Sequence, residues 1–320
     1  MRIAIAGPGA LGCLFASLLS QKKQSKKDSL WLLDHNRERA ALLNRQGIVY
    51  ETDRSQKRIL ISVSAEPRAI TPVDMALFCV KSYDLVACLQ FCLPLLSPQT
   101  LLVFLQNGIG HLNIQERTNL PTCPAFASCS EGATLLGPGH VLHAGHGKTH
   151  LGFIQKPAEL QQQQLTELVL NLRETGLDAS LSENILTQLW AKLFINAGIN
   201  PLTALYNRSN GQILTTCAAR GRLKNIVREA EAVARACGIP IQIDPMQATL
   251  GVCKSTARNI SSMLQDRRNN RPTEIDAING AVVREGKRVG VPTPFNEELV
   301  EQIKDMENKY RQNSARTEKT

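Results

Sequence analysis

The pattern of hydrophobic and polar residues predicts an α/β arrangement over the first third of the chain. Short apolar runs predict buried strands at 2–7, 29–34, 74–81 and 100–107. Stretches between these runs predict helices at 10–21, 36–47 and 82–96. Strands that alternate with helices are typical of a doubly wound, parallel sheet.

The pattern changes twice further along the chain. Residues 125–154 are rich in glycine and in alternating apolar residues, which predicts antiparallel strands joined by turns. A helix is predicted at 157–176, ending at a glycine. Beyond residue 181 almost every segment has a helical pattern, punctuated by proline and glycine. We therefore predict two domains, a mixed α/β domain at 1–181 and an all-α domain at 182–320.

The composition narrows the class of protein. The length of 320 residues agrees with about two domains, and a hydrophobic content of 43% with only 4% aromatic residues indicates an aliphatic core. No apolar run reaches the roughly 18 residues of a membrane span, and the N-terminus lacks the pattern of a secretory signal. The nine cysteines are scattered and form no CxxC pair, which favours reduced thiols in a cytoplasmic protein.

The net charge of +9 is compatible either with nucleic acid or with an anionic substrate and cofactor. Local clusters of charge occur at 22–27 and in the tail at 304–320, where we expect a solvated surface and a frayed end. No basic stripe is interleaved with aromatic residues, so we do not expect nucleic-acid binding.

A glycine-rich loop joins the first predicted strand to the first predicted helix. The sequence GPGALG at 7–12 has the GxGxxG spacing of dinucleotide-binding loops. Its glycines would allow a tight turn, a close approach of the backbone to a pyrophosphate, and packing of the helix on the strand. The helix N-terminus would then present N–H groups to the phosphates. The loop predicts a Rossmann-type domain, and the alternative is an ordinary strand–helix turn. The expected cofactor-binding residues of the loop are Gly7, Pro8, Gly9, Ala10, Leu11 and Gly12.

Further cofactor candidates lie where later strands end. Asp34 ends the second strand, where an acid usually binds the adenosine ribose hydroxyls and favours NAD. Arg37 belongs to a run with basic residues at 35–39 that could instead contact the 2′-phosphate of NADP, so these residues leave the choice open. Lys81 and Asn107 end the next two strands, at the sheet edge where ligands bind. The alternatives are a surface lysine and an ordinary Asn-Gly turn.

Three polar residues interrupt an otherwise apolar helical stretch around residues 186–197. Lys192, Asn196 and Asn200 are spaced at i, i+4 and i+8, so they form a ladder along one border of the apolar stripe. The ladder predicts the wall of a cleft; the alternative is a lysine that snorkels to solvent beside two locally bonded asparagines. Because Asn200 precedes Pro201, we expect the helix to end there.

A second set of polar residues lies near the start of later helices. Thr273 is suited to cap a helix, which would put Glu274 in the first turn, where the helix dipole keeps a carboxylate ionised. That dipole interaction alone would also explain the acid. Asn259 and Ser262 are spaced at i, i+3 on another predicted helix, where they could bind a carboxylate or lie on the surface.

Several stretches together resemble the ketopantoate reductase family (2-dehydropantoate 2-reductase). They are GPGALG at 7–12, LQNGIG at 105–110, GPGHVLHAGHGKTHLG at 137–152, WAKLFINAGINPLTAL at 190–205 and NISSMLQDRRNNRPTEIDAINGAVV at 259–283. The resemblance covers nearly the whole chain, and the last two stretches are specific to that family. It implies a Rossmann-type doubly wound sheet followed by an all-α domain similar to the C-terminal domain of 6-phosphogluconate dehydrogenase.

The resemblance also implies an activity, the NADPH-dependent reduction of 2-dehydropantoate to D-pantoate on the way to pantothenate and coenzyme A. Lys192 would be the general acid and Glu274 would bind the substrate hydroxyl. The substrate would also be held by Asn107, Asn196, Asn200, Asn259 and Ser262, while Asn107 and Lys81 would contact the cofactor. Family members that use NADPH usually have a basic residue where this chain has Asp34, so NADH stays possible. We expect a monomer or a homodimer.

The chemistry of the residues agrees with this activity. Hydride transfer to a ketone leaves negative charge on its oxygen, and a positioned lysine ammonium can stabilise that charge and then protonate it. A related reductase of another 2-oxo acid is a close alternative. A dinucleotide-binding sensor without catalysis is a more distant one, because a sensor would need neither Lys192 nor Glu274.

Four histidines within 140–150 invite a zinc or iron hypothesis. Their spacing matches neither one helix face nor one strand face, and the glycines between them suggest a hairpin. The same stretch resembles a family segment that binds no catalytic metal, so we expect no metal site.

Overall fold

The computed structural model describes residues 1–21, 29–114, 118, 120 and 122–317, so the basic cluster at 22–27 lies outside the described residues. The chain forms two compact units. The first consists of Met1–Gln106 and Asn113–Ile185, and the second of Asn107–Leu112 and Leu186–Thr320. The division expected at 181 and 182 differs from this chiefly in the short segment Asn107–Leu112, which packs with the helical unit.

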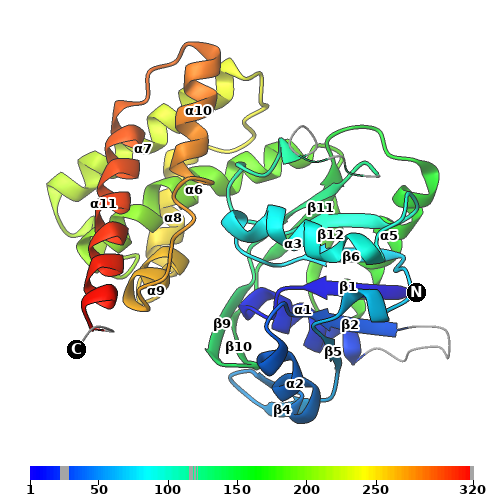
Figure 1. Ribbon diagram of the computed structural model, residues 1–320. Helices are drawn as coiled ribbons and strands as arrows, with labels where there is room; N and C mark the ends of the chain where they lie inside the picture. The colour runs from blue at the N-terminus through cyan, green and yellow to red at the C-terminus, as the bar shows by residue number, and fades with distance from the viewer. Residues whose placement is uncertain (22–28, 115–117, 119, 121, 318–320) are drawn as a thin grey trace. The chain divides into compact units, whose positions relative to one another are not determined.

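A parallel-rich sheet forms the centre of the first unit (Figure 1). Its strands are β1 (Arg2–Ala6), β2 (Ser29–Leu33), β5 (Ser62–Ser64), β6 (Met75–Phe78), β7 (Leu101–Phe104), β8 (Ala125–Cys129), β11 (Lys148–Phe153) and β12 (Asp178–Leu181). Their order is β12-β11-β8-β7-β6-β1-β2-β5, and β11 runs antiparallel to β8 while the other neighbouring pairs are parallel. The α/β fold class predicted from the alternation of elements is therefore confirmed.

A smaller sheet completes the first unit. It consists of β3 (Ile48–Glu51), β4 (Gln56–Ile59), β9 (Gly132–Gly137) and β10 (His140–Gly145) in the order β4-β3-β10-β9. The antiparallel β9–β10 hairpin confirms that strands joined by turns form this region, but it turns at residues 138–139, before the histidines. The hairpin predicted between the histidines is wrong, because β10 and β11 belong to different sheets. Helix α1 (Ala10–Ser20) contacts strands of both sheets, so it packs between them. Its side chains from Cys13 to Leu19 are buried, and burial raises the pKa of the Cys13 thiol to about 12.

Within its described residues the first unit also contains the helices α2 (Arg37–Gln46), α3 (Leu85–Cys92) and α5 (Glu159–Glu174). The helix predicted at 82–96 is shorter in the structure, because short 3-10 turns at Ser82–Asp84 and Leu93–Leu95 flank α3. The second of these turns contains Pro94, which has no N–H to continue an α-helix.

The second unit is helical, as predicted (Figure 1). Its helices are α6 (Ile185–Tyr206), α7 (Cys217–Ala236), α8 (Pro245–Ser255), α9 (Ser262–Arg268), α10 (Asn279–Val289) and α11 (Pro294–Thr317), with a 3-10 turn at Gln212–Leu214. Helices α7, α10 and α11 pack against one another. None of the helices among the described residues has the length and apolar character needed to cross a membrane.

Three details of the helical unit differ from the predictions. Helix α6 does not end at Asn200 but continues through Pro201 to Tyr206. Helix α10 begins at Asn279 rather than near Thr273. The tail expected to fray is helical as far as Thr317.

Candidate active site

A hydrogen-bonded group of three side chains forms the centre of the candidate site in the second unit. The Oδ1 atom of Asn107 accepts a hydrogen bond from Lys192 Nζ at 2.8 Å. The Nδ2 atom of the same amide donates to Glu274 Oε2 at 3.0 Å. Lysine can only donate and a carboxylate accepts, so these two partners fix the orientation of the amide. The carboxylate of Glu274 belongs to a residue that is only 4% exposed, while Lys192 is half-buried on α6.

The backbone that carries Asn107 fits closely against the segment that carries Glu274. Gly108 has a φ of +79°, and a Cβ atom added there would lie 2.0 Å from the carbonyl oxygen of Ala277. That oxygen accepts hydrogen bonds from the N–H groups of Ile109 at 3.0 Å and Gly110 at 3.2 Å. A Cβ on Gly110 would also lie 2.9 Å from Ala277 Cα. The glycines of the QNGIG stretch therefore permit an approach that no larger residue would allow.

This approach explains why α10 starts later than predicted. Glu274 lies in a turn before the helix, where its carbonyl oxygen accepts from the N–H groups of Ala277 at 3.0 Å and Ile278 at 3.1 Å. The Ala277 carbonyl, which a longer helix would use internally, is bonded instead to Ile109 and Gly110. Thr273 still caps locally, since its Oγ1 accepts from Ile275 N at 3.3 Å. The expected stabilisation of Glu274 by the first turn of a helix is therefore wrong.

The charges of Glu274 and Lys192 also act on His111, a residue that was not predicted from the sequence. The residue is 3% exposed. Burial lowers the pKa of His111 to about 4, the carboxylate of Glu274 opposes this shift, and the ammonium of Lys192 adds to it. The imidazole is therefore neutral near pH 7. The signal that could have found it was its place directly after the glycines of the QNGIG stretch.

The other expected substrate residues are distributed over α6 and the start of α9. Asn196 is half-buried and Asn200 is 6% exposed, and both lie on α6 with Lys192. Asn259 was expected on a helix but lies in the loop before α9, where its carbonyl oxygen accepts from Asn210 N at 3.0 Å. Ser262 is the exposed first residue of α9. Because Ser261 is the N-cap, the helix starts between the two predicted residues, and they do not share a helix face.

The glycine loop of the first unit has the geometry expected of a dinucleotide loop. Gly7 has a φ of +100°, and a Cβ on Gly12 would lie 1.9 Å from the Gly7 carbonyl oxygen. A Cβ on Gly9 would meet no atom within 4 Å, so the backbone there is open to a close ligand. Gly9 is also the N-cap of α1 and offers no side chain to its first-turn N–H groups. These groups fit the pyrophosphate of a dinucleotide.

The end of β2 carries a buried ion pair that bears on the choice of cofactor. The Asp34 side chain is fully buried, and its carboxylate accepts from Arg39 Nη2 at 2.7 Å and from Arg39 Nε. The backbone N–H of Asn36 donates to the same carboxylate at 3.0 Å. Arg37, by contrast, is exposed and pairs with Glu66 at 3.3 Å. Lys81 is half-buried and is the N-cap of the 3-10 turn after β6.

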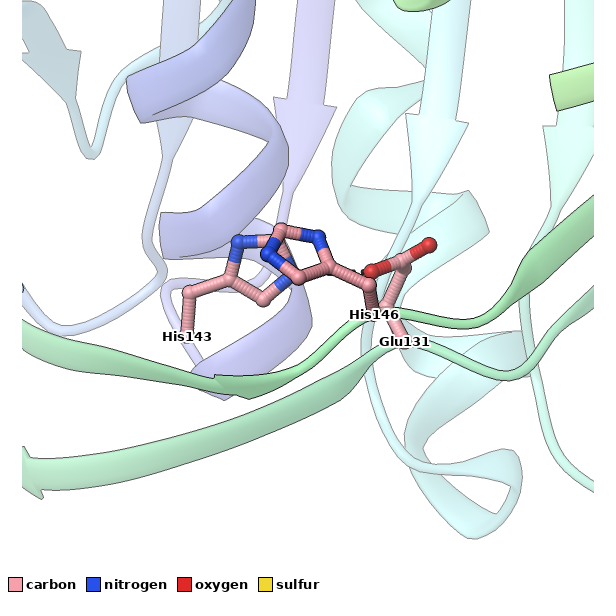
Figure 2. A group of neighbouring side chains, drawn as sticks. All are labelled: Glu131, His143 and His146. Atoms are coloured by element: carbon pink, nitrogen blue, oxygen red, sulfur yellow. Dashed lines mark hydrogen bonds and ion pairs between the residues drawn. The ribbon is translucent and has the colours of Figure 1, made fainter. Parts of the chain in front are cut away.

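The histidine-rich hairpin brings together one group with the composition of a metal site. Figure 2 shows Glu131, His143 and His146, whose potential ligand atoms all lie within 4.8 Å of one another. His143 Nε2 is 2.8 Å from the Glu131 carboxylate, and its Nδ1 is 3.1 Å from the hydroxyl of Tyr50. Hydrogen bonds thus satisfy both ring nitrogens of this buried imidazole without an ion. The absence of a metal from this site stays a prediction.

The chain matches known protein families and individual proteins over most of its length. Two family models match the chain, "Ketopantoate reductase PanE/ApbA" over residues 3–156 and "Ketopantoate reductase PanE/ApbA C terminal" over residues 184–307. A 2-dehydropantoate 2-reductase of Vibrio cholerae is 31% identical over 97% of this chain and 99% of its own length. One of Escherichia coli O157:H7 is also 31% identical, over 97% of this chain and 96% of its own.

Solved structures show the same likeness. A PanE/ApbA family ketopantoate reductase from Ralstonia eutropha superposes with a TM-score of 0.86 at 28% identity, covering 97% of this chain and 100% of that one. A D-mandelate dehydrogenase with NADH and anilino(oxo)acetate has the same TM-score, identity and coverage. Proteins whose names give different substrates therefore share this fold.

Proposed function

The chain belongs to the ketopantoate reductase family, and from this premise we propose that it catalyses the NADPH-dependent reduction of 2-dehydropantoate. The proposed product is D-pantoate, which is (R)-pantoate, for the synthesis of pantothenate and coenzyme A. The observation that carries the proposal is the pair of hydrogen bonds that joins Lys192, Asn107 and Glu274, at 2.8 and 3.0 Å. They hold a proton donor and a carboxylate at the two ends of one amide, as this substrate requires.

The proposed mechanism assigns one role to each of these side chains. A bound reduced nicotinamide supplies the hydride. Lys192 donates a hydrogen bond from Nζ to the ketone oxygen, stabilises the negative charge that develops there, and then transfers a proton to it. Glu274 accepts a hydrogen bond from the primary hydroxyl of the substrate. Asn107 sets the distance between these two groups, which limits the ways in which a small 2-oxo acid can bind.

The carboxylate of the substrate needs donors, and the proposal assigns this task to side chains near Lys192. Asn196 and Asn200 lie on the same helix as the lysine, and amide N–H groups are suitable donors to a carboxylate. Asn259 and Ser262 stay in the proposal as further contacts to the substrate. His111 is neutral and buried, so it adds no positive charge that would compete with the ammonium of Lys192.

The cofactor is proposed to bind to the domain at 1–181 that we assign to dinucleotide binding, while the domain at 182–320 carries catalysis. The glycine loop at 7–12 would hold the pyrophosphate, with Lys81 and Asn107 as further contacts. We propose NADPH because Arg39 neutralises the Asp34 carboxylate that would otherwise repel a 2′-phosphate. Exposed Arg37 is a second candidate donor to that phosphate. NADH remains the alternative cofactor, since Asp34 also suits the ribose hydroxyls.

A second candidate function is the reduction of another 2-oxo acid. The likeness to a D-mandelate dehydrogenase, whose structure contains NADH and anilino(oxo)acetate, supports this alternative. Both functions need the same proton donor, but only an acid with a hydroxyl needs an acceptor at Glu274. In either case we propose a cytoplasmic monomer or homodimer that acts on small molecules and not on nucleic acid or membranes.

The test is the rate of NADPH and of NADH oxidation with ketopantoate and with a panel of other 2-oxo acids, including aromatic ones. The proposal predicts the highest kcat/KM for ketopantoate with NADPH. Higher kcat/KM for an acid without a hydroxyl would favour the second function. Tight dinucleotide binding without oxidation by any acid of the panel would contradict both.

A further inference from the structure

Helix α6 contains a proline whose effect on the backbone is compensated from another helix. Pro201 has no N–H, so the carbonyl oxygen of Ala197, four residues earlier, loses its usual partner within the helix. The side chain of Asn279, the first residue of α10, donates from Nδ2 to this oxygen at 3.1 Å. The side chain of Asn279 thus replaces the missing backbone donor.

Asn279 is held in this orientation by a chain of buried polar groups. Its Nδ2 also donates to Asn296 Oδ1 at 3.0 Å, and Asn296 Nδ2 donates in turn to the carboxylate of Glu229 at 2.7 Å and to Ile226 O at 3.2 Å. Both asparagines are 0% exposed. Reversing either amide would bring oxygen against oxygen, so the network permits one arrangement.

Glu229, the last side chain in this series of buried polar groups, caps the N-terminus of α11. The Glu229 carboxylate, on α7, accepts from the backbone N–H groups of Phe295 and Asn296 at 2.9 Å each, in the first turn of α11. A carboxylate that caps a helix N-terminus is held both by hydrogen bonds and by the helix dipole. The position of Asn279 is therefore fixed by α7 and α11 as well as by its own helix.

The hydrogen bond from Asn279 to Ala197 joins two segments of the candidate site, helix α6 with Lys192 and the turn with Glu274. Ala197 lies five residues after Lys192 and directly after Asn196 on α6. Asn279 lies five residues after Glu274. In the turn between them, the carbonyl oxygen of Ala277 accepts hydrogen bonds from the segment that follows Asn107. The hydrogen bond from Asn279 to Ala197 therefore ties the helix of the proton donor to the turn of the carboxylate.

We propose that Asn279 is a positioning residue, which sets the spacing between Lys192 and Glu274 by holding the proline-containing part of α6 against the start of α10. The inference rests on the proposed function of those two side chains. Asn279 is 0% exposed, so its proposed role does not involve contact with substrate. It acts through the backbone of Ala197, and only because Pro201 leaves that carbonyl without an intrahelical donor.

The test is a double-mutant cycle at Asn279, which donates to the Ala197 carbonyl, and at Pro201, which lacks the N–H that would otherwise do so. Asn279→Leu removes the donor but keeps the branched shape and number of side-chain heavy atoms, and Asn279→Asp keeps size and polarity but replaces the donor with an acceptor. Pro201→Ala restores a backbone N–H that can bond Ala197 O from within α6. Each variant, and Asn279→Leu combined with Pro201→Ala, is measured for kcat, for KM of the 2-oxo acid, for dinucleotide Kd and for urea unfolding.

The proposal predicts that Asn279→Leu and Asn279→Asp lower kcat by about 10-fold or more with unchanged dinucleotide Kd, as expected for a displaced catalytic group. It also predicts that Pro201→Ala restores most of the lost kcat in the Asn279→Leu background. A merely structural role would lower the unfolding free energy and leave kcat unchanged. That result, or a loss of kcat that Pro201→Ala does not reduce, would overturn the proposal.

These outcomes are distinct from a failure of the proposed function. If the unmodified protein reduced a 2-oxo acid other than ketopantoate, the same cycle would be measured with that acid. If it reduced none, the positioning role would be overturned together with the proposed function. Asn279→Asp serves if Asn279→Leu does not fold, because it retains a polar group of the same size within the network.

Discussion

The substitution Gly108→Ala probes the close fit on which the candidate site depends. Gly108 has a φ of +79°, in the left-handed region that costs an L-residue about 1–2 kcal/mol. The added Cβ would also lie 2.0 Å from Ala277 O, which is part of the backbone and cannot rotate away. The segment must therefore move.

The movement would break two hydrogen bonds whose loss can be estimated. Ile109 N and Gly110 N both donate to Ala277 O, and an intramolecular hydrogen bond contributes about 1 kcal/mol to stability. Together with the unfavourable φ, we expect the free energy of unfolding to fall by about 3–4 kcal/mol. Because Asn107 directly precedes Gly108, its bonds to Lys192 and Glu274 should be lost as well, and kcat should fall by at least about 10-fold.

Urea unfolding and steady-state kinetics measure these two effects. The matched control is Gly221→Ala in α7, where an added Cβ meets no atom within 4 Å and φ is not positive. That substitution should raise stability by up to about 1 kcal/mol, since alanine favours a helix over glycine, and should leave kcat unchanged. If Gly108→Ala had the unfolding free energy and kcat of the unmodified protein, the site would not depend on the close fit at Gly108.

Three further predictions concern individual side chains. Glu274→Ala should raise KM for ketopantoate about 10-fold or more and leave dinucleotide Kd unchanged. The control Asp276→Ala, at an exposed acid paired with Lys304, should change neither constant. A loss of dinucleotide affinity in Glu274→Ala would contradict the assignment of Glu274 to substrate binding. The pKa of His111 is lowered to about 4, while an unfolded histidine titrates near 6.5. The folded protein should therefore lose about 3 kcal/mol of stability as the pH falls from about 6.5 to 4. A loss of equal size in His111→Asn would disprove this prediction. Arg39→Ala should lower the ratio of kcat/KM with NADPH to that with NADH by about 10-fold, because it leaves the Asp34 carboxylate without its bidentate partner; an unchanged ratio would exclude the pair from cofactor choice.

Local patterns in the sequence predict the fold well where one period dominates. The strands β1, β2, β6 and β7 are short apolar runs buried in a parallel sheet. Such continuous apolar runs are typical of strands that are covered on both faces, so a strand is predicted from the sequence alone. The strand β4 was missed because it reads QKRI and is mostly exposed, so it carries no apolar period. Pairing with β3 determines its conformation, and pairing between distant segments leaves no mark in a local pattern.

The errors in the candidate site have a related cause. Pro201 predicts a helix end locally, yet α6 continues because Asn279, from a distant part of the chain, supplies a donor to Ala197. Thr273 predicts a helix start, yet the Ala277 carbonyl is bonded to Ile109 and Gly110. In both places a tertiary hydrogen bond overrides a local preference of the backbone.

The kinetics of Lys192→Ala test directly whether this lysine protonates the product, with Lys192→Arg as the variant that retains the charge. We expect Lys192→Ala to lower kcat/KM for the 2-oxo acid by about 10²-fold or more, while the dinucleotide still binds with unchanged Kd. Lys192→Arg should remain impaired, because a guanidinium stabilises the oxyanion but does not readily release its proton. A near-normal kcat/KM for Lys192→Ala would contradict the claim that this lysine protonates the product.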